Sequence, residues 1–153
     1  MVFFKYLIIL ICLGITLQEE KISLLSTNGT IAFTKINDYS LGLSSYKTNI
    51  QYLLSKSLIS IEVVVTSDID SSKAQSQPIR VYSKLNEVPR PESFFYDKKD
   101  DIAQYNKETN QYIYNFEYTP CEISIEDVIN IKIVGIEGTS TFNLNVYLLN
   151  SNE

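Results

Sequence analysis

The chain has 153 residues, the length of one domain, with a net charge of −5 and no histidine. The lack of histidine excludes Ser-His-Asp and Cys-His nucleophilic systems, and with them the usual histidine-containing zinc sites. The longest basic run is Lys98-Lys99, and Asp100-Asp101 follows it at once. This charge pattern disfavours nucleic acid and anionic membrane surfaces as partners.

The first 16 residues have the layout of a secretory signal peptide. Lys5 precedes an apolar run over 6–13, and small or polar residues follow. The run is shorter than the ~20 residues of a membrane-spanning helix. We expect cleavage after Gly14 or Thr16, the alternative being an uncleaved anchor. Removal of residues 1–16 leaves 12 basic and 18 acidic residues, a net charge of −6. The prediction is a secreted, extracellular protein that is not inserted in a membrane after cleavage.

Beyond the signal peptide, apolar residues alternate with a period of two, which is typical of half-buried strands. The clearest runs are "LISIEVVV" (58–65), "QYIYNFEY" (111–118), "VINIKIVG" (128–135) and "TFNLNVYLL" (141–149). Their inward faces are expected to carry Ile59, Ile61, Val63 and Val65; Tyr112, Tyr114, Phe116 and Tyr118; Ile129, Ile131 and Ile133; and Phe142, Leu144, Val146 and Leu148.

Weaker strands are expected at 30–36, 48–54, 79–85 and 121–125, and 22–47 supplies the leading strands. "GIEG" (135–138) predicts a tight hairpin connection before the last strand. About eight short strands separated by polar turns indicate an all-β fold, an antiparallel β-sandwich of jelly-roll type. We predict one such domain over 22–149, followed by a short tail over 150–153.

Two polar loops separate the strands, at 66–78 and 86–110, and the length of the second indicates either a function or disorder. It contains "VPRPESFFYD", in which two prolines stiffen the backbone and prevent it from joining a sheet ladder. Phe94, Phe95 and Tyr96 are consecutive, so their side chains cannot all point the same way. We expect at least one to cap the end of the sandwich and one to stay exposed.

The order of these elements resembles secreted β-sandwich modules of the pre-peptidase C-terminal type and related jelly-roll modules. "RVYSKLNEVPRPESFFYD" and "INIKIVGIEGTSTFNLNVYL" stand where that family has a "LYV" strand, a proline loop, an aromatic-Asp pair and a Gly-bounded final hairpin. The resemblance covers about residues 48–149 and implies a non-catalytic extracellular module. The family's aspartates before the "LYV" strand are replaced by "SQPIRVY", and the acids move to Asp68 and Asp70, which departs from the family's calcium site.

Two further residues concern modification and cross-linking. Asn28-Gly29-Thr30 is a glycosylation sequon, and its Asn-Gly pair is also a turn signal, so a glycoprotein is expected. Cys121 is the one cysteine left after signal cleavage. It is interpreted as a buried thiol, with an intermolecular disulfide as the alternative.

Carboxylates offer the remaining chemistry. No cofactor is expected, but Asp68 and Asp70, together with Asp97, Asp100 and Asp101, could supply oxygen ligands for calcium. The alternative is solvated acidic loops.

The favoured function is a secreted, non-catalytic module that binds an extracellular protein or glycan, or serves as a structural component. Phe94, Phe95 and Tyr96 would supply apolar contact and Arg90 polar selectivity. Two other classes stay open: a small carboxylate-based hydrolase of the glycosidase type, and a carrier of apolar ligands, which would need an internal cavity.

Overall fold

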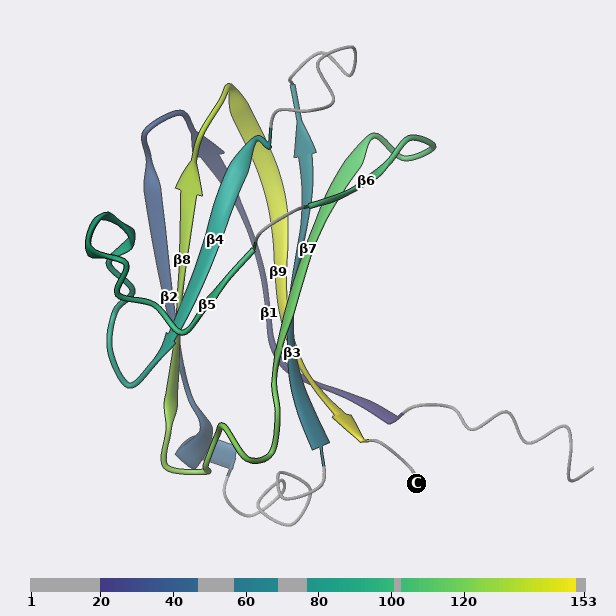
Figure 1. Ribbon diagram of the computed structural model, residues 1–153. Helices are drawn as coiled ribbons and strands as arrows, with labels where there is room; N and C mark the ends of the chain where they lie inside the picture. Colours follow the sequence, from purple (N-terminus) through teal and green to yellow (C-terminus); the bar gives the residue numbers. More distant parts are fainter. Residues whose placement is uncertain (1–19, 47–56, 69–76, 101–102, 151–153) are drawn as a thin grey trace, which may run out of the picture.

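The structure, a computed structural model, describes residues 20–46, 57–68, 77–100 and 103–150. They form two antiparallel sheets packed face to face (Figure 1). Sheet A has the strand order β1-β9-β3-β7-β6 and sheet B the order β2-β8-β4-β5. The strands are β1 (Glu20–Ala32), β2 (Ile36–Gly42), β3 (Ser57–Ser67), β4 (Ile79–Leu85), β5 (Lys98–Lys99), β6 (Gln104–Asn106), β7 (Gln111–Tyr118), β8 (Val128–Gly135) and β9 (Thr139–Asn150). Among the described residues, the 3-10 turns η1 (Leu43–Tyr46) and η3 (Pro91–Ser93) lie between strands.

The strand order confirms the predicted jelly roll. In sheet A the first strand lies beside the last, and in sheet B the second lies beside the last but one. The short β6 is an additional edge strand next to β7. Connections such as β7–β8 and β8–β9 therefore pass from one sheet to the other.

The predicted hairpin at 135–138 is wrong for this reason. Gly135 ends β8 in sheet B, and Thr139 begins β9 in sheet A, so the segment crosses between sheets. The crossing also brings backbones together: the Gly135 N–H donates to the Lys35 carbonyl at 3.0 Å, and a Cβ at Gly135 would overlap the Ala32 carbonyl oxygen. Glycine is needed here because only a hydrogen fits.

The predicted inward faces are confirmed. On β3, the residues Ile59, Ile61, Val63 and Val65 are fully buried, and the inward residues of β8 and β9 are at most 2% exposed. On β7 the three inward tyrosines are buried and Phe116 is partly buried against the core. These side chains fill the space between the sheets by packing against one another, as a solid core requires.

Two tyrosine hydroxyls join the sheets across this core. Tyr114 of sheet A donates to the Ile79 carbonyl of sheet B at 3.2 Å, and Tyr118 donates to Ser83 Oγ at 2.9 Å. Burial raises the pKa of both phenols well above the ordinary value. Both hydroxyls therefore stay protonated and act as donors that fix the relative position of the sheets.

Of the weaker strands, 79–85 is confirmed as β4, and 48–54 lies outside the described residues. The prediction at 30–36 is wrong, because 33–35 is the turn between β1 and β2. The leading strands expected within 22–47 are β1 and β2. A β-bulge between Ser23 and Leu25 interrupts the alternation of β1, so the period of two did not give the bounds of this long strand. The prediction at 121–125 is also wrong: a turn closes there, in which the Glu122 N–H donates to the Thr119 carbonyl at 3.0 Å.

Asn28 and Gly29 lie inside β1 and do not form a turn. They pair with Asn143 and Phe142 of β9. A Cβ at Gly29 would lie 2.7 Å from Phe142 Cζ, so glycine at this position leaves room for the phenylalanine ring beneath the strand. Glycine inside a strand marks a close approach here rather than a reversal of the chain.

Among the described residues, no helix has the length and apolar character needed to cross a membrane.

Candidate functional site

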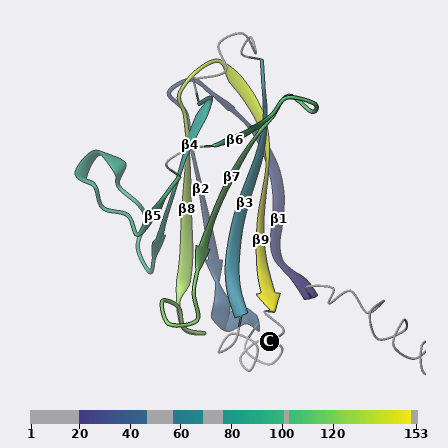
Figure 2. The ribbon, with the colours of Figure 1, turned by 45° about the vertical axis from the view of Figure 1, so that its right-hand side comes forward.

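The segment between β4 and β5, which we call the 86–97 loop, projects from the body of the sandwich in both ribbon views (Figures 1 and 2). Its base begins at Asn86, whose backbone has a φ of 65°. Asn tolerates this left-handed conformation better than most residues. Its N–H donates to the Val128 carbonyl at 2.7 Å, and its side chain binds the Val128 N–H and Asp127 Oδ1 at 2.9 and 2.8 Å. The loop is thus attached to the start of β8.

Asp97 closes the other side of the loop. Its N–H donates to the Ser83 carbonyl at 2.9 Å, Oδ1 accepts from Lys84 Nζ at 3.0 Å, and Oδ2 accepts from the Leu85 N–H at 2.8 Å. Both carboxylate oxygens therefore hold the end of β4. Asp97 acts as a positioning residue of the loop.

The tip of the loop is a small reversal of the chain around η3. Arg90 and Phe95 pair in an antiparallel bridge, with N–H to carbonyl distances of 2.9 and 3.1 Å. Between them the Phe94 N–H donates to the Pro91 carbonyl at 3.1 Å, and Phe94 has φ 55° and ψ 29°. This left-handed conformation costs a bulky L-residue about 1–2 kcal/mol. The bridge and the proline turn hold Phe94 in it.

The three consecutive aromatics have different environments. The Phe95 ring lies beneath Arg90 and Lys84, whose cationic groups are 4.4 and 4.2 Å from its centroid. Tyr96 packs on Tyr82, with ring centroids 5.2 Å apart. Phe94 is 82% exposed. The sequence predicted one exposed aromatic, and the structure identifies it as Phe94.

The expected capping of the core by this cluster is wrong. Phe95 and Tyr96 are half-buried, and neither belongs to the buried core. The residues of β4 that point inward and are fully buried are Ile79, Val81 and Ser83. Tyr82 lies between the last two and faces outward, so Tyr96 packs on the outer surface of sheet B.

Two of the candidate calcium ligands, Asp68 and Asp97, are not brought together. Asp68 accepts from the Thr139 N–H at 3.0 Å, where β9 begins, whereas Asp97 is held at the end of β4. Leu85, which Asp97 binds, pairs with Ile129 near the start of β8, whereas Thr139, which Asp68 binds, follows the end of β8. The two carboxylates therefore lie at opposite ends of β8, about 20 Å apart. Asp70 and Asp101 lie outside the described residues. Within the described part of the chain, no group of three or more metal-ligating side chains forms.

Asp100 is the carboxylate whose environment departs most from water. It is 5% exposed, and its Oδ1 accepts from the Val81 N–H at 2.5 Å. Burial raises the pKa of Asp100 to about 7.

Cys121 is exposed, so the preferred interpretation as a buried thiol is wrong. The turn that carries it is closed by Glu122, whose Oε2 accepts from the Thr119 N–H at 2.7 Å. The first side chain of this segment to enter the core is Ile123, which is 7% exposed. The thiol is left on the surface, where the alternative of an intermolecular disulfide stays a prediction.

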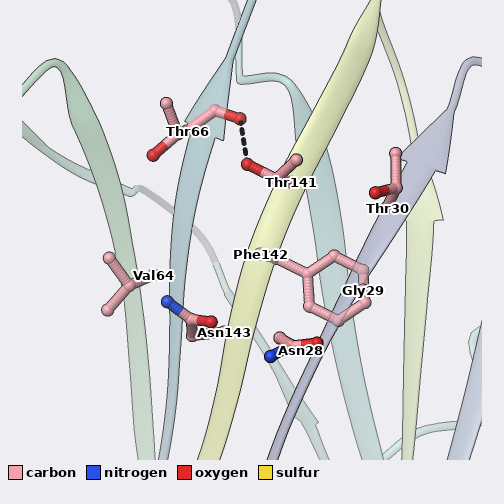
Figure 3. A pocket seen from close by; sticks show the side chains of 8 residues that line it. All are labelled: Asn28, Gly29, Thr30, Val64, Thr66, Thr141, Phe142 and Asn143. Atoms are coloured by element: carbon pink, nitrogen blue, oxygen red, sulfur yellow. Dashed lines mark hydrogen bonds between the residues drawn. The ribbon is translucent and has the colours of Figure 1, made fainter.

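The sequence did not reveal a cleft of about 290 Å³ on the outer face of sheet A (Figure 3). It lies over β1, β9 and β3, and the sequon residues Asn28 and Thr30 are part of its lining. Both are exposed and therefore accessible to glycosylation. Glycosylation of Asn28 stays a prediction. A signal was present in "TNGT" and "TSTFNLN", where asparagine and threonine occupy outward positions, but periodicity does not show that these positions meet.

No protein-family model matches this chain, and no curated protein matches it. Three viral proteins are among the solved structures with some similarity. They come from Desmodium yellow mottle tymovirus (11% identity, 86% of this chain and 87% of that chain, TM-score 0.35), turnip yellow mosaic virus (12%, 88% and 95%, 0.31), and the virus-like particle of the extra small virus of the prawn Macrobrachium rosenbergii (12%, 89% and 82%, 0.28). At these TM-scores the likeness supports no inference about function.

Proposed function

We propose that the chain is a secreted, non-catalytic binding module whose 86–97 loop docks on an extracellular protein through Phe94. One observation carries this proposal: an 82%-exposed phenylalanine held in a left-handed conformation at the tip of a braced loop. Such strain persists where the surrounding structure enforces it, and it clusters at functional sites. Aromatic side chains are enriched in interface cores because they offer large, rigid apolar contact area.

The loop suits docking because its shape exists before a partner arrives. Hydrogen bonds from Asn86 and Asp97 fix both ends, and the Arg90–Phe95 bridge fixes the tip. A preformed loop loses little conformational entropy on binding, so more of the contact energy contributes to affinity. Val88, 51% exposed on the same loop, adds apolar surface, and the exposed Arg90 adds polar selectivity. The proposed relation to pre-peptidase C-terminal modules is in keeping with this function.

The two alternative functions, a carrier of apolar ligands and a glycosidase-type hydrolase, receive less support. The core residues of both sheets fill the interior, which does not favour a carrier of apolar ligands. Asp97 is engaged in closing the loop and Asp68 lies far from it, so these acids do not make a glycosidase pair, which needs carboxyls roughly 5–10 Å apart.

The test compares three variants of the secreted protein as bait in the extracellular medium, with captured proteins quantified by mass spectrometry. Phe94→Gly removes the ring and also relieves the left-handed strain, so its melting temperature should equal or exceed that of the wild type. Phe94→Ala removes the ring and keeps the strain. Phe33→Ala is the matched control, a 62%-exposed phenylalanine in the β1–β2 turn at the other end of β8.

We expect both Phe94 variants to capture at least tenfold less of one specific protein than the wild type does, as for a central interface residue. Phe33→Ala should capture as much of it as the wild type. Equal capture by wild type and Phe94→Gly would overturn the proposal. So would an equal loss in Phe33→Ala.

A further inference from the structure

The cleft on sheet A is an ordered array of short side chains from three neighbouring strands. The strand registers place Asn28, Asn143 and Val64 in one row across β1, β9 and β3. Thr30, Thr141 and Thr66 form the next row. Neighbouring strands are about 4.8 Å apart, and successive outward residues are about 6.8 Å apart. Figure 3 shows these side chains around the common space.

The floor of the cleft is made by Gly29 and Phe142. Gly29 lies between the two rows on β1, and the ring of Phe142 lies beneath it. Phe142 is 2% exposed and also meets Tyr39 of sheet B edge to face, with centroids 6.2 Å apart. The floor is therefore supported by the core and is not a mobile surface.

The lining is polar and carries no charge. Each threonine hydroxyl donates and accepts, and each asparagine amide offers a carbonyl oxygen and two N–H groups. Within the described part of the chain, one hydrogen bond engages these side chains, from Thr141 Oγ1 to the Thr66 carbonyl at 3.5 Å. The side chains of Asn28, Thr30 and Asn143 make none there. Val64 contributes methyl groups at one edge.

We propose that this cleft binds one ring of a neutral sugar. An anionic ligand would find no cation in the lining, and a cationic one would find no acid. An apolar ligand would leave the hydroxyls and amides without partners, which costs about 1–3 kcal/mol per buried group. A pyranose has adjacent hydroxyls for the two rows and apolar C–H groups for Val64. The volume of about 290 Å³ is near the lower end of small-molecule sites.

The sugar has two sources, because Asn28 is both the sequon asparagine and part of the lining. It belongs either to a separate glycan or to a glycan attached to Asn28 itself. The first arm of the test uses unglycosylated, ¹⁵N-labelled protein from bacteria, titrated with the methyl glycosides of glucose, galactose, mannose and N-acetylglucosamine. Glucuronate is the charged comparison. Amide shifts of Gly29, Thr30 and Thr141 report binding.

The variants Thr30→Val and Thr141→Val each remove one hydroxyl and keep the shape and β-branched character that strands favour. Thr139→Val is the matched control, because Thr139 is an exposed outward residue of β9 outside the lining. Thr30 is on an edge strand, so its variant keeps the test available if Thr141→Val folds poorly. For a separate glycan, we expect the wild-type amides to show saturable shifts with at least one neutral sugar and no shifts with glucuronate. Binding should be at least tenfold weaker in Thr30→Val and Thr141→Val, and unchanged in Thr139→Val.

The second arm uses protein glycosylated in eukaryotic cells, compared with Asn28→Gln. If the attached glycan occupies the cleft, the same amides shift in the glycosylated protein and Thr141→Val reverses the shift. The proposal is overturned if neither free sugars nor the Asn28 glycan perturbs these amides, or if Thr139→Val weakens binding as much as Thr141→Val. Phe94→Gly should leave sugar binding unchanged, which separates this site from the protein-docking loop.

Discussion

The buried carboxyl group of Asp100 makes the stability of the fold depend on pH. The carboxyl group is buried where β5 ends. Its Oδ1 accepts from the Val81 N–H, and its Oδ2 has no hydrogen-bond partner among the residues that the structure describes. Arg80 and Lys99 lower its pKa, but the cost of burying the charge is larger and raises the pKa to about 7. Burial is the main cause of the raised pKa of Tyr82 and Tyr114, and the negative charge of Asp100 adds to it.

The folded state therefore holds a proton on Asp100 between about pH 4 and pH 7, where the unfolded state has lost it. Stability should fall as pH rises through this window and level off above pH 7. Asp100→Asn keeps an acceptor for the Val81 N–H and carries no charge. We expect the variant to unfold at a higher urea concentration than the wild type at pH 8. Its free energy of unfolding there should be larger by on the order of 1–4 kcal/mol, and the difference should disappear near pH 4.

Urea titrations followed by circular dichroism at pH 4, 6 and 8 measure this difference. Asp38→Asn is the control, because Asp38 is an exposed partner of Lys132. A constant difference between Asp100→Asn and the wild type across this range would contradict the prediction.

At the scale of elements, the 86–97 loop is shaped by side-chain hydrogen bonds because no sheet ladder runs through it. Asp97 makes the contacts at one end, to Lys84 and Leu85, and Asn86 makes those at the other. Phe95 and Tyr96 pack on cationic side chains and on Tyr82 at the outer surface of sheet B. The loop should therefore be able to loosen while the sandwich stays folded.

Asp97→Ala tests this independence. Loss of both carboxylate oxygens should speed amide exchange across residues 86–97, while the free energy of global unfolding falls by less than about 1 kcal/mol, since the Lys84 ion pair is partly exposed. Hydrogen–deuterium exchange with mass spectrometry measures the first effect and a thermal melt the second. Asp38→Ala, in the exposed ion pair with Lys132, should leave exchange in the loop unchanged. Slow exchange of the loop in Asp97→Ala would show that Asp97 does not position it.

At the scale of the whole molecule, the jelly roll joins distant parts of the chain. β9 lies between β1 and β3, so the sheet is completed by the last strand. The turn that carries Cys121 lies outside this framework, and its thiol is exposed. Reactions at that thiol should therefore affect association between molecules without disturbing the fold.

We expect Cys121 to react with a thiol reagent in the native state, and a disulfide-linked dimer to form in aerobic solution. Non-reducing gel electrophoresis measures the dimer, which should be absent with reductant and in Cys121→Ser. The variant should unfold at the wild-type temperature, because an exposed side chain makes little contribution to packing. A thiol that reacts only after denaturation would contradict its placement on the surface.

Much of the fold was predictable because alternation reports the two faces of a strand directly. The inward faces of β3, β7, β8 and β9 followed from their residues, and so did the jelly-roll class. Leading strands were expected within 22–47, but the bounds of β1 were not predicted, because its bulge interrupts the alternation and its Asn28-Gly29 pair is typical of a turn. In the 86–97 loop the sequence left three candidates for the exposed aromatic residue. The structure identifies it as Phe94, whose backbone is left-handed.

The sequence by itself determined which residues face inward, which chemistries a chain without histidine excludes, and where the proline loop lies. The tertiary structure decided which strands are neighbours, that 135–138 crosses between sheets, and that Asp68 and Asp97 are far apart. It also decided that Asn28, Thr141 and Thr66 meet in one cleft. The physical reason is that alternation is a property of one strand, whereas pairing and proximity depend on contacts between residues far apart in the sequence, such as Asn28 with Asn143 and Thr66 with Thr141.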